Sequence, residues 1–146
     1  MIQDRGFTLF ELMIVIVILG ILAPIIVIGL RGARTKARNA TARADLESIE
    51  SAILTYEQRH YTYPPVSGWE TYLQNDEPRL IDRIPEDPWA SGGAKYVYDL
   101  DTTSTPGTYL ILSVGEDQTR DAQVGDDIVT NKDDDIIATN AKTISD

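Results

Sequence analysis

Hydrophobic residues are distributed along this chain in two different ways. The first is an apolar run that extends without a charge from Leu12 to Leu30, with Phe7 to Phe10 lengthening it at its start. A helix over residues 7–30 is about 36 Å long at about 1.5 Å per residue, which is enough to span a bilayer. The sequence therefore predicts a transmembrane helix over residues 7–30.

The second pattern begins at Arg31, where apolar residues are interspersed with charged ones. They recur mostly every three or four residues, which is the spacing of an amphipathic helix packed on a domain. The members of this stripe are Ala33, Ala37, Ala40, Ala44, Ile49, Ala52, Ile53 and Tyr56. We expect the helix to continue over residues 31–60, with the small residues of its first half allowing close approach of a neighbour.

The helical pattern ends at Tyr61 to Pro65, because consecutive prolines force an extended backbone. A short helix is expected near Trp69 to Leu73. Two strand-like runs, Tyr96 to Leu100 and Thr108 to Val114, then predict an antiparallel hairpin packed on the long helix. The predicted fold class is α+β: a long N-terminal helix on a small antiparallel sheet, with a C-terminal loop, residues 61–146 forming the globular domain.

One carboxylate, Glu11, stands at the head of the apolar run. A charged side chain deep in a bilayer costs about 2.5 to 3.5 kcal/mol, so it usually has a partner and a function. The alternative is that Glu11 sits near the headgroups and extends its carboxylate to water. A secretory signal peptide is the competing interpretation of the segment, but the run is long for one and only Arg5 precedes it as a basic residue.

The residues from Gly6 to Ala23, GFTLFELMIVIVILGILA, resemble the N-terminus of type IV prepilins and of type II secretion pseudopilins. The resemblance implies a leader peptide of residues 1–6, cleavage by a prepilin peptidase between Gly6 and Phe7, and N-methylation of Phe7. It also implies that Glu11 guides subunit docking and that residues 7–30 form a filament core. The Phe7 ammonium of the same or a neighbouring subunit would then neutralise Glu11.

Charge is divided sharply along the chain. Between Arg31 and Ala44 there are five basic residues and no acid, whereas residues 45–146 hold 21 acids against seven Lys or Arg. We call residues 31–44 the basic neck. It is expected to bind anionic headgroups or acidic surfaces of neighbouring subunits, and the alternative is a solvated helix face. Positive-inside counting places the neck in the cytoplasm. The prepilin resemblance requires the short leader inside and the acidic body outside, and we follow it as the more specific signal.

Four short segments further along resemble the major pseudopilins of type II secretion systems in order and spacing. They are Tyr63-Pro64, Asp87-Pro88-Trp89, Leu112 to Asp117, and Asp126-Asp127-Ile128. The resemblance implies a calcium-binding loop with the carboxylates of Asp117, Asp126 and Asp127 and the Val114 carbonyl as ligands. Calcium takes six to eight oxygen ligands. Since the chain has no cysteine, the ion could replace a disulfide as the clamp of this region.

The alternative for the same loop is a solvated acidic segment without an ion. The loop lacks the spacing of an EF-hand, and Arg120 adds a positive charge beside Asp117. The later run Asp133, Asp134 and Asp135 is expected to face solvent, with a ligand role as its alternative.

Catalytic chemistry is not indicated, and we expect no enzyme. The single histidine, His60, falls at the end of the predicted helix, where capping or solvent exposure is expected, and the sequence has no Gly-rich phosphate loop. Two function classes remain. One is a structural subunit that polymerises through its hydrophobic helix, and the other is a membrane-anchored acidic binding module that never polymerises. Within the first class, the resemblance favours a type II secretion pseudopilin over a type IV pilus subunit.

The resemblance also implies the partners and the location. The partners are further copies of the chain in a helical filament, the prepilin peptidase, an inner-membrane platform protein, an assembly ATPase, minor pseudopilins and the membrane; nucleic acid is not among them. Before assembly the chain would cross the inner membrane once, with its C-terminal domain in the periplasm. After assembly it would lie in a periplasmic pseudopilus or an extracellular filament.

Overall fold

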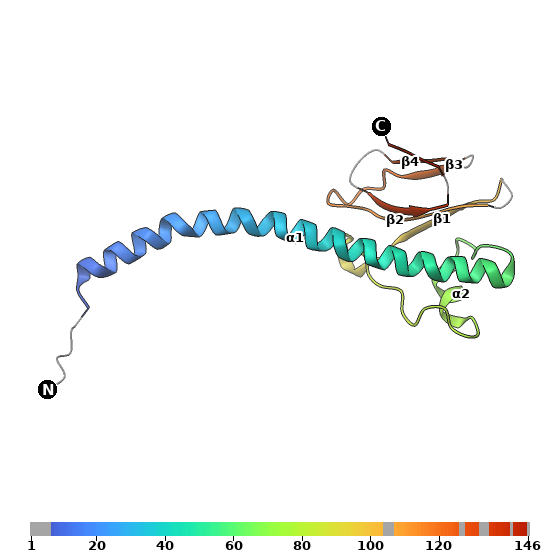
Figure 1. The fold of residues 1–146 in the computed structure, drawn as a ribbon, viewed down its shortest axis with the longest axis horizontal. Helices are drawn as coiled ribbons and strands as arrows, with labels where there is room; N and C mark the ends of the chain where they lie inside the picture. The colour runs from blue at the N-terminus through green and yellow to red at the C-terminus, as the bar shows by residue number, and fades with distance from the viewer. Residues whose placement is uncertain (1–6, 104–106, 126–127, 132–134, 141, 146) are drawn as a thin grey trace. The chain divides into compact units, whose positions relative to one another are not determined.

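The computed structural model describes residues 7–103, 107–125, 128–131, 135–140 and 142–145, and the chain divides into two compact units, Met1–Ala37 and Arg38–Asp146. We call the second unit the body. One helix, α1 (Leu9–His60), runs through both units (Figure 1). The prediction of a single continuous helix from the apolar run into the amphipathic stretch is therefore confirmed.

The apolar side chains at the start of α1 are exposed to solvent. Those described are Phe7, Leu9, Phe10, Leu12, Met13, Ile14, Val15, Ile16, Val17, Ile18, Leu19, Ile21 and Leu22. Within the described part of the chain, we find no helix that combines the length and the apolarity needed to cross a membrane. The side chains of residues 24–31, which include the end of the predicted span, are outside the described part.

The second half of α1 belongs to the body, and one of its faces packs against the other elements of the body. Its buried members are Ala42, Leu46, Ile49, Ala52, Ile53 and Tyr56. The predicted stripe is confirmed from Ile49 to Tyr56 and is wrong before it, because Ala33, Ala37, Ala40 and Ala44 are exposed. Ala40 and Ala44 each stand two residues from a buried position, which is about 200° around a helix. The buried face of α1 is therefore the one that carries Leu46, and not the one that carries these four alanines.

The segment after α1 follows the predicted order. The helix ends at His60, and Tyr61 adopts a left-handed backbone with φ of 56°. The short helix α2 (Trp69–Asn75) starts after Gly68, whose φ is 77°. Trp69 and Leu73 of α2 are buried in the same core cluster as α1. The short helix expected near Trp69 is confirmed.

The first sheet has the strand order β1-β2-β5 and is antiparallel throughout. Strand β1 (Val97–Asp101) pairs with β2 (Thr108–Ser113) in the register Val97 to Leu112, which confirms the predicted hairpin. Strand β5 (Ile136–Thr139) pairs with the other edge of β2. A 3-10 turn, η1 (Ser91–Gly93), precedes the hairpin.

Strand β2 is buried along its whole length because both of its faces are covered. Tyr109 and Ile111 lie in the core cluster with α1, while Leu110 and Leu112 form a second cluster with Ala122. Figure 1 shows the second half of α1 running alongside β1 and β2. Burial on two faces explains why β2 is a continuous apolar run rather than an alternating one.

Two tyrosine hydroxyls, one from β2 and one from the residue directly before β1, bond to α1. Tyr96 donates to Asp45 Oδ2 at 2.7 Å, and Tyr109 donates to Glu50 Oε1 at 2.7 Å. Burial, followed by the bond to the carboxylate, raises the pKa of both phenols, so both remain protonated donors. These pairs fix the position of α1 along the hairpin.

A second sheet, with the order β3-β4-β6, was not predicted. It consists of β3 (Gln123–Gly125), β4 (Ile128–Asn131) and β6 (Lys142–Ser145), with β3 antiparallel and β6 parallel to β4. The sequence analysis assigned this stretch to a C-terminal loop, and for these strands and for β5 that is wrong. Each strand is only three or four residues long and lies among aspartates, so alternation is too short to detect. The α+β class is unaffected.

Candidate functional site

Glu11 is held at the N-terminus of α1 by Thr8. The Thr8 backbone N–H and hydroxyl donate to Glu11 Oε2 at 2.9 and 2.8 Å, and the Glu11 N–H donates to Thr8 Oγ1 at 3.2 Å. This reciprocal arrangement is a capping box, which satisfies N–H groups that a helix start leaves without partners. The Thr8-x-x-Glu11 spacing could have predicted it, and the sequence analysis missed it.

The capping box determines what Glu11 can do. It places the carboxylate at the helix start, bonded to Thr8, the residue directly after Phe7. Phe7 and Glu11 are both exposed. The local bonds therefore leave Glu11 accessible to a partner while preventing the helix end from fraying. Gly6, the other expected processing residue, lies outside the described residues.

The acidic loop after β2 holds Asp117 in a defined conformation. The Thr119 N–H donates to Asp117 Oδ1 at 2.8 Å and the Thr119 hydroxyl to Asp117 Oδ2 at 2.6 Å. The hydroxyl bond and then the N–H bond hold the pKa of Asp117 below its ordinary value of 3.8. The same hydroxyl lies 3.2 Å from Asp121 Oδ2. Two carboxylates thus converge on one hydroxyl in this loop.

The expected calcium ligands are only partly within the described structure. Val114 and Asp117 are described, whereas Asp126 and Asp127 are not. Over the described ranges, no three acidic or histidine side chains lie close enough together to hold a metal ion. The described donors nevertheless fit a hard cation in kind, because Asp117 offers an exposed carboxylate and Val114 a main-chain carbonyl.

Asp135 is buried, contrary to the expectation that it faces solvent. It is 6% exposed, and its Oδ2 accepts the N–H groups of Asp121 and Ala122, both at 2.8 Å. The assignment to solvent was wrong because a run of three aspartates gives no indication that one of them contacts a loop 13 residues earlier. Asp133 and Asp134 lie outside the described residues.

Asp87 is the second buried carboxylate that the sequence analysis missed. It is 3% exposed and accepts three hydrogen bonds, from the Trp89 N–H, the Ser113 hydroxyl and the Val114 N–H. The available signal was Asp-Pro-Trp, since an aspartate two residues before an N–H donor commonly forms an Asx turn. The acidic loop therefore has a buried carboxylate at each end, Asp87 at Val114 and Asp135 at Asp121.

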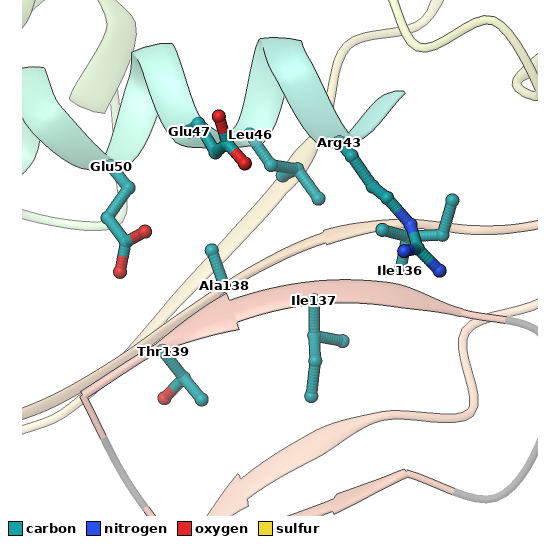
Figure 2. A pocket seen from close by; sticks show the side chains of 8 residues that line it. All are labelled: Arg43, Leu46, Glu47, Glu50, Ile136, Ile137, Ala138 and Thr139. Carbon is teal, nitrogen blue, oxygen red and sulfur yellow. The ribbon is translucent and has the colours of Figure 1, made fainter. Parts of the chain in front are cut away.

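A groove of about 330 Å³ lies between α1 and β5. Figure 2 shows Arg43 and Glu50 at its two ends, with Leu46 extending from α1 toward β5 between them. The lining mixes apolar and charged groups of both signs. It was not predicted, because it requires β5, which the sequence analysis did not identify.

His60 is exposed at the end of α1, as expected, and it also contributes to a junction there. Its Nε2 lies 3.0 Å from Asp76 Oδ1, and its ring stacks on Tyr56 at 4.2 Å between centroids. The Arg59 guanidinium donates to the other oxygen of Asp76 at 2.9 Å. Although partial burial opposes it, the bonds from His60 and Arg59 hold the pKa of Asp76 below its ordinary value. The last turn of α1 is thus tied to the end of α2.

Comparison with known proteins gives two matches to family models. The model described as type II secretion system protein G matches residues 30–132, and the prokaryotic N-terminal methylation motif matches residues 1–23. The second match includes Gly6, Phe7 and Glu11, which the sequence analysis selected for processing and assembly. Together the two models cover residues 1–23 and 30–132 of the 146-residue chain.

Curated proteins similar to this chain carry one name, type II secretion system core protein G. The protein of Escherichia coli K12 is 33% identical over 126 residues, covering 79% of this chain and 83% of its own length. The protein of Aeromonas hydrophila is 36% identical over 137 residues, with coverages of 86% and 91%. The protein of Vibrio cholerae is 35% identical over 125 residues, with coverages of 79% and 82%.

Proposed function

Because the chain belongs to the family of type II secretion system protein G, we propose that it is a structural pseudopilin, the subunit that polymerises into the pseudopilus of a type II secretion system. The observation that carries this proposal is the family match over residues 30–132. The family is structural, and the sequence contains no constellation that indicates catalysis.

The N-terminal part of α1 supplies the surface for polymerisation. Thirteen large apolar side chains between Phe7 and Leu22 are exposed in the single chain. Soluble monomers rarely leave so many neighbouring apolar side chains uncovered, and such a surface is typical of an interaction site. In a filament these side chains would be buried against the same segment of neighbouring copies, and Glu11 would set the register by meeting the Phe7 ammonium of a neighbour.

Processing and location follow from the same segment. The methylation motif supports cleavage by a prepilin peptidase between Gly6 and Phe7, with N-methylation of Phe7. The apolar run of residues 7–30 anchors the unassembled subunit in the inner membrane with its body in the periplasm. The platform protein and assembly ATPase then extract it into a periplasmic pseudopilus, and minor pseudopilins complete the structure.

Filament formation by processed chains tests this proposal. In cells that carry the secretion system, electron microscopy of surface-sheared material should show filaments for the wild type and none for Glu11→Ala. Gly6→Ala should leave the leader attached, which the intact mass of the chain reports. Asp82→Ala is the matched control, because Asp82 is an almost fully exposed acid of the body. Normal filaments from Glu11→Ala would contradict the docking role, and a wild-type mass that begins at unmethylated Met1 would contradict the processing.

We further propose that the acidic loop binds calcium through the Val114 carbonyl and the carboxylates of Asp117, Asp126 and Asp127. Bound calcium would supply a concentrated positive charge that joins these oxygens. The exposed carboxylate of Asp117, already oriented by Thr119, supports the proposal. The absence of cysteine leaves this region without a disulfide, so an ion is a reasonable clamp.

A calcium-dependent rise in melting temperature tests whether the acidic loop binds calcium. The wild-type chain should melt at a higher temperature with calcium than with a chelator, because a ligand that binds only the folded state stabilises it. Asp117→Ala should remove this difference, while Glu116→Ala, a neighbouring exposed acid outside the proposed ligand set, should keep it. A wild-type chain whose melting is the same with calcium and with chelator would exclude the calcium loop but leave the pseudopilin assignment intact.

A further inference from the structure

Four charged residues of α1 recur at every seventh position. They are Lys36, Arg43, Glu50 and Glu57. Residues seven apart on a helix lie almost above one another, because the direction of the side chain drifts by only about 20° per seven residues. The four side chains therefore form a row along one side of α1, with two bases followed by two acids. We call these four residues the charge row.

The charge row is accessible, and its charges are not paired within the chain. Lys36 and Arg43 are exposed, and Glu50 and Glu57 are half-buried. Among the residues that the structure describes, none of the four forms an ion pair. The one side-chain bond of Glu50 comes from the neutral hydroxyl of Tyr109. Figure 2 shows Arg43 and Glu50 extending from the same side of α1.

Bases elsewhere in the body, where their side chains are described, are engaged with groups of their own chain. Arg59, Arg79, Arg83 and Arg120 each pair with an acid, Lys95 donates to the Ile84 carbonyl, and Arg38 lies over the Trp89 ring. The chain has a net charge of −10, so acids are in excess as partners. Arg43 nevertheless has no acid beside it, even though Glu47 follows four residues later on the same helix. The charge row thus keeps its charges available to another molecule.

The order of the charges selects one register for two parallel copies of α1 that face each other through the charge row. A displacement by 14 residues, about 21 Å along the helix, brings Lys36 opposite Glu50 and Arg43 opposite Glu57. A displacement by seven residues pairs Arg43 with Glu50, but it also sets Lys36 beside Arg43 and Glu50 beside Glu57. With no displacement each residue meets its own counterpart. Because like charges side by side are unfavourable, the 14-residue displacement alone gives two attractive pairs and no repulsive one.

We infer that the charge row is a second docking surface between subunits, which binds the charge row of another copy of this chain at a displacement of about 21 Å along α1. The inference rests on the pseudopilin function proposed above, because it concerns how copies of the chain meet in a filament. The exposed apolar residues between Phe7 and Leu22 supply contact area at the start of α1. The charge row supplies a preferred axial position along its second half, since complementary charges fix register more than they add affinity.

Anionic headgroups are the competing partner for the two bases. They would attract Arg34, a further exposed base of the basic neck, as well as Lys36 and Arg43. Arg34 stands two residues before Lys36, which is about 200° around the helix, and so it lies off the charge row. Headgroups would also leave the two acids of the charge row without a role. The two partners therefore differ in whether they need Arg34 and in whether they need Glu57.

Charge exchange between Arg43 and Glu57 tests the pairing. In cells that carry the secretion system, the yield of filaments in surface-sheared material is measured by immunoblot relative to the total amount of the chain. Arg43→Glu and Glu57→Arg alone should each lower this yield by about tenfold, because an attractive pair becomes a repulsive one at every contact. The chain with both changes restores opposite charges and should recover the wild-type yield. Arg34→Glu is the matched control and should keep it.

Cross-linking checks the same register in case a reversed charge disturbs the fold, which thermal melting of each purified chain in detergent reports. The chain has no cysteine, so two introduced thiols are the only ones present. Filaments of the Arg43→Cys and Glu57→Cys double variant, treated with a short bifunctional maleimide, should give a ladder of covalent multimers. The matched double variant with Arg34→Cys and Glu57→Cys should remain monomeric on a denaturing gel.

The outcomes separate this inference from the proposal beneath it. A wild-type chain that forms no filaments overturns the pseudopilin proposal and the docking role with it. Wild-type filaments together with an undiminished yield from Arg43→Glu overturn only the docking role. An exchanged chain that stays as low as the single variants also overturns it, and an equal loss in Arg34→Glu would then assign the basic neck to anionic headgroups. Equal cross-linking of the two cysteine pairs contradicts the 14-residue register.

Discussion

The two halves of α1 contain similar apolar residues but use them differently. Leu22, in the first half, is 49% exposed, whereas Leu46, in the second half, is 2% exposed. Both are leucines in one continuous helix, so helix propensity and hydrophobicity do not distinguish them. The difference is that strands β1, β2 and β5 supply a partner for the second half. Whether a leucine of α1 is buried thus depends on whether other elements of the chain pack against that part of the helix.

This difference indicates which surface is available to bind other molecules. The body buries its apolar side chains in its own core, and two of its tyrosine hydroxyls donate to carboxylates of α1. The N-terminal segment has equally apolar side chains, and those described between Phe7 and Leu22 stay exposed. A subunit that first sits in a membrane and then in a filament needs such a division: one part folds alone, and the other is completed by its surroundings.

The largest effect is expected from removing the first part altogether. A chain shortened to residues 33–146 should be a folded monomer in detergent-free buffer, because the core lies in the body. The full chain in the same buffer should associate through its exposed apolar residues. Light scattering after size-exclusion chromatography measures the mass, and thermal melting measures the fold. A shortened chain that is unfolded, or that associates like the full chain, would contradict the division.

A matched pair of leucine substitutions tests the same contrast within the intact chain. Leu46→Ala should lower the free energy of unfolding of the body by about 2 to 5 kcal/mol, because it empties a fully packed position. Leu22→Ala removes the same atoms from an exposed position and should leave it unchanged. Urea unfolding in detergent, followed by tryptophan fluorescence, measures both, since Trp69 and Trp89 lie in the body. Equal losses would show that the two halves are not independent.

A smaller effect is expected from the hydroxyl that Tyr109 donates to Glu50. Tyr109→Phe keeps the ring and removes the bond, which should cost about 1.5 to 3 kcal/mol, the range of hydrogen bonds to charged groups. Tyr61→Phe, at a highly exposed position, is the control and should cost nothing. A Tyr109→Phe chain as stable as the wild type would show that apolar packing alone holds α1 on the sheet.

The sequence predicted those elements whose signals are local and long. The continuous apolar run, the prolines after Tyr63 and the alternation around Tyr98 each extend over enough residues to indicate a helix, a break and a strand. The alanines from Ala33 to Ala44 do not mark the buried face, because alanine is tolerated on either side of a helix. The strands from Gln123 onward were missed because each is stabilised by pairing and not by its own pattern.

For the candidate site, too, only residues with a local sequence signal could be predicted. Glu11 could be selected from the sequence because its anomaly is visible in a short window. The roles of Asp87 and Asp135 could not, since Asp87 contacts Ser113 from 26 residues away and Asp135 contacts Ala122 from 13 residues away. A buried carboxylate is identified by its donors, and here those donors are brought to it only by the fold.

The smallest expected effect is a loss of stability of the body at acid pH. Asp76 is bonded by Arg59 and His60, and its folded-state pKa lies below the ordinary value of 3.8. A carboxyl group with a depressed folded-state pKa stabilises the fold above its unfolded pKa, and this contribution is lost as pH falls through the folded value. The stability of the wild-type chain should therefore decline as the pH falls below 3.8.

Asp76→Asn should flatten that decline, because the asparagine takes up no proton in either state. At neutral pH the variant should melt slightly below the wild type, and the two melting curves should converge at the lowest pH. Asp82→Asn is the control, since Asp82 is exposed and its contact with Arg79 is long at 3.5 Å; it should follow the wild type. If Asp76→Asn keeps the full acid decline, other carboxylates of the body cause it, and the junction of α1 with α2 is held by packing such as the edge-to-face contact of Tyr56 with Tyr72 and not by charge.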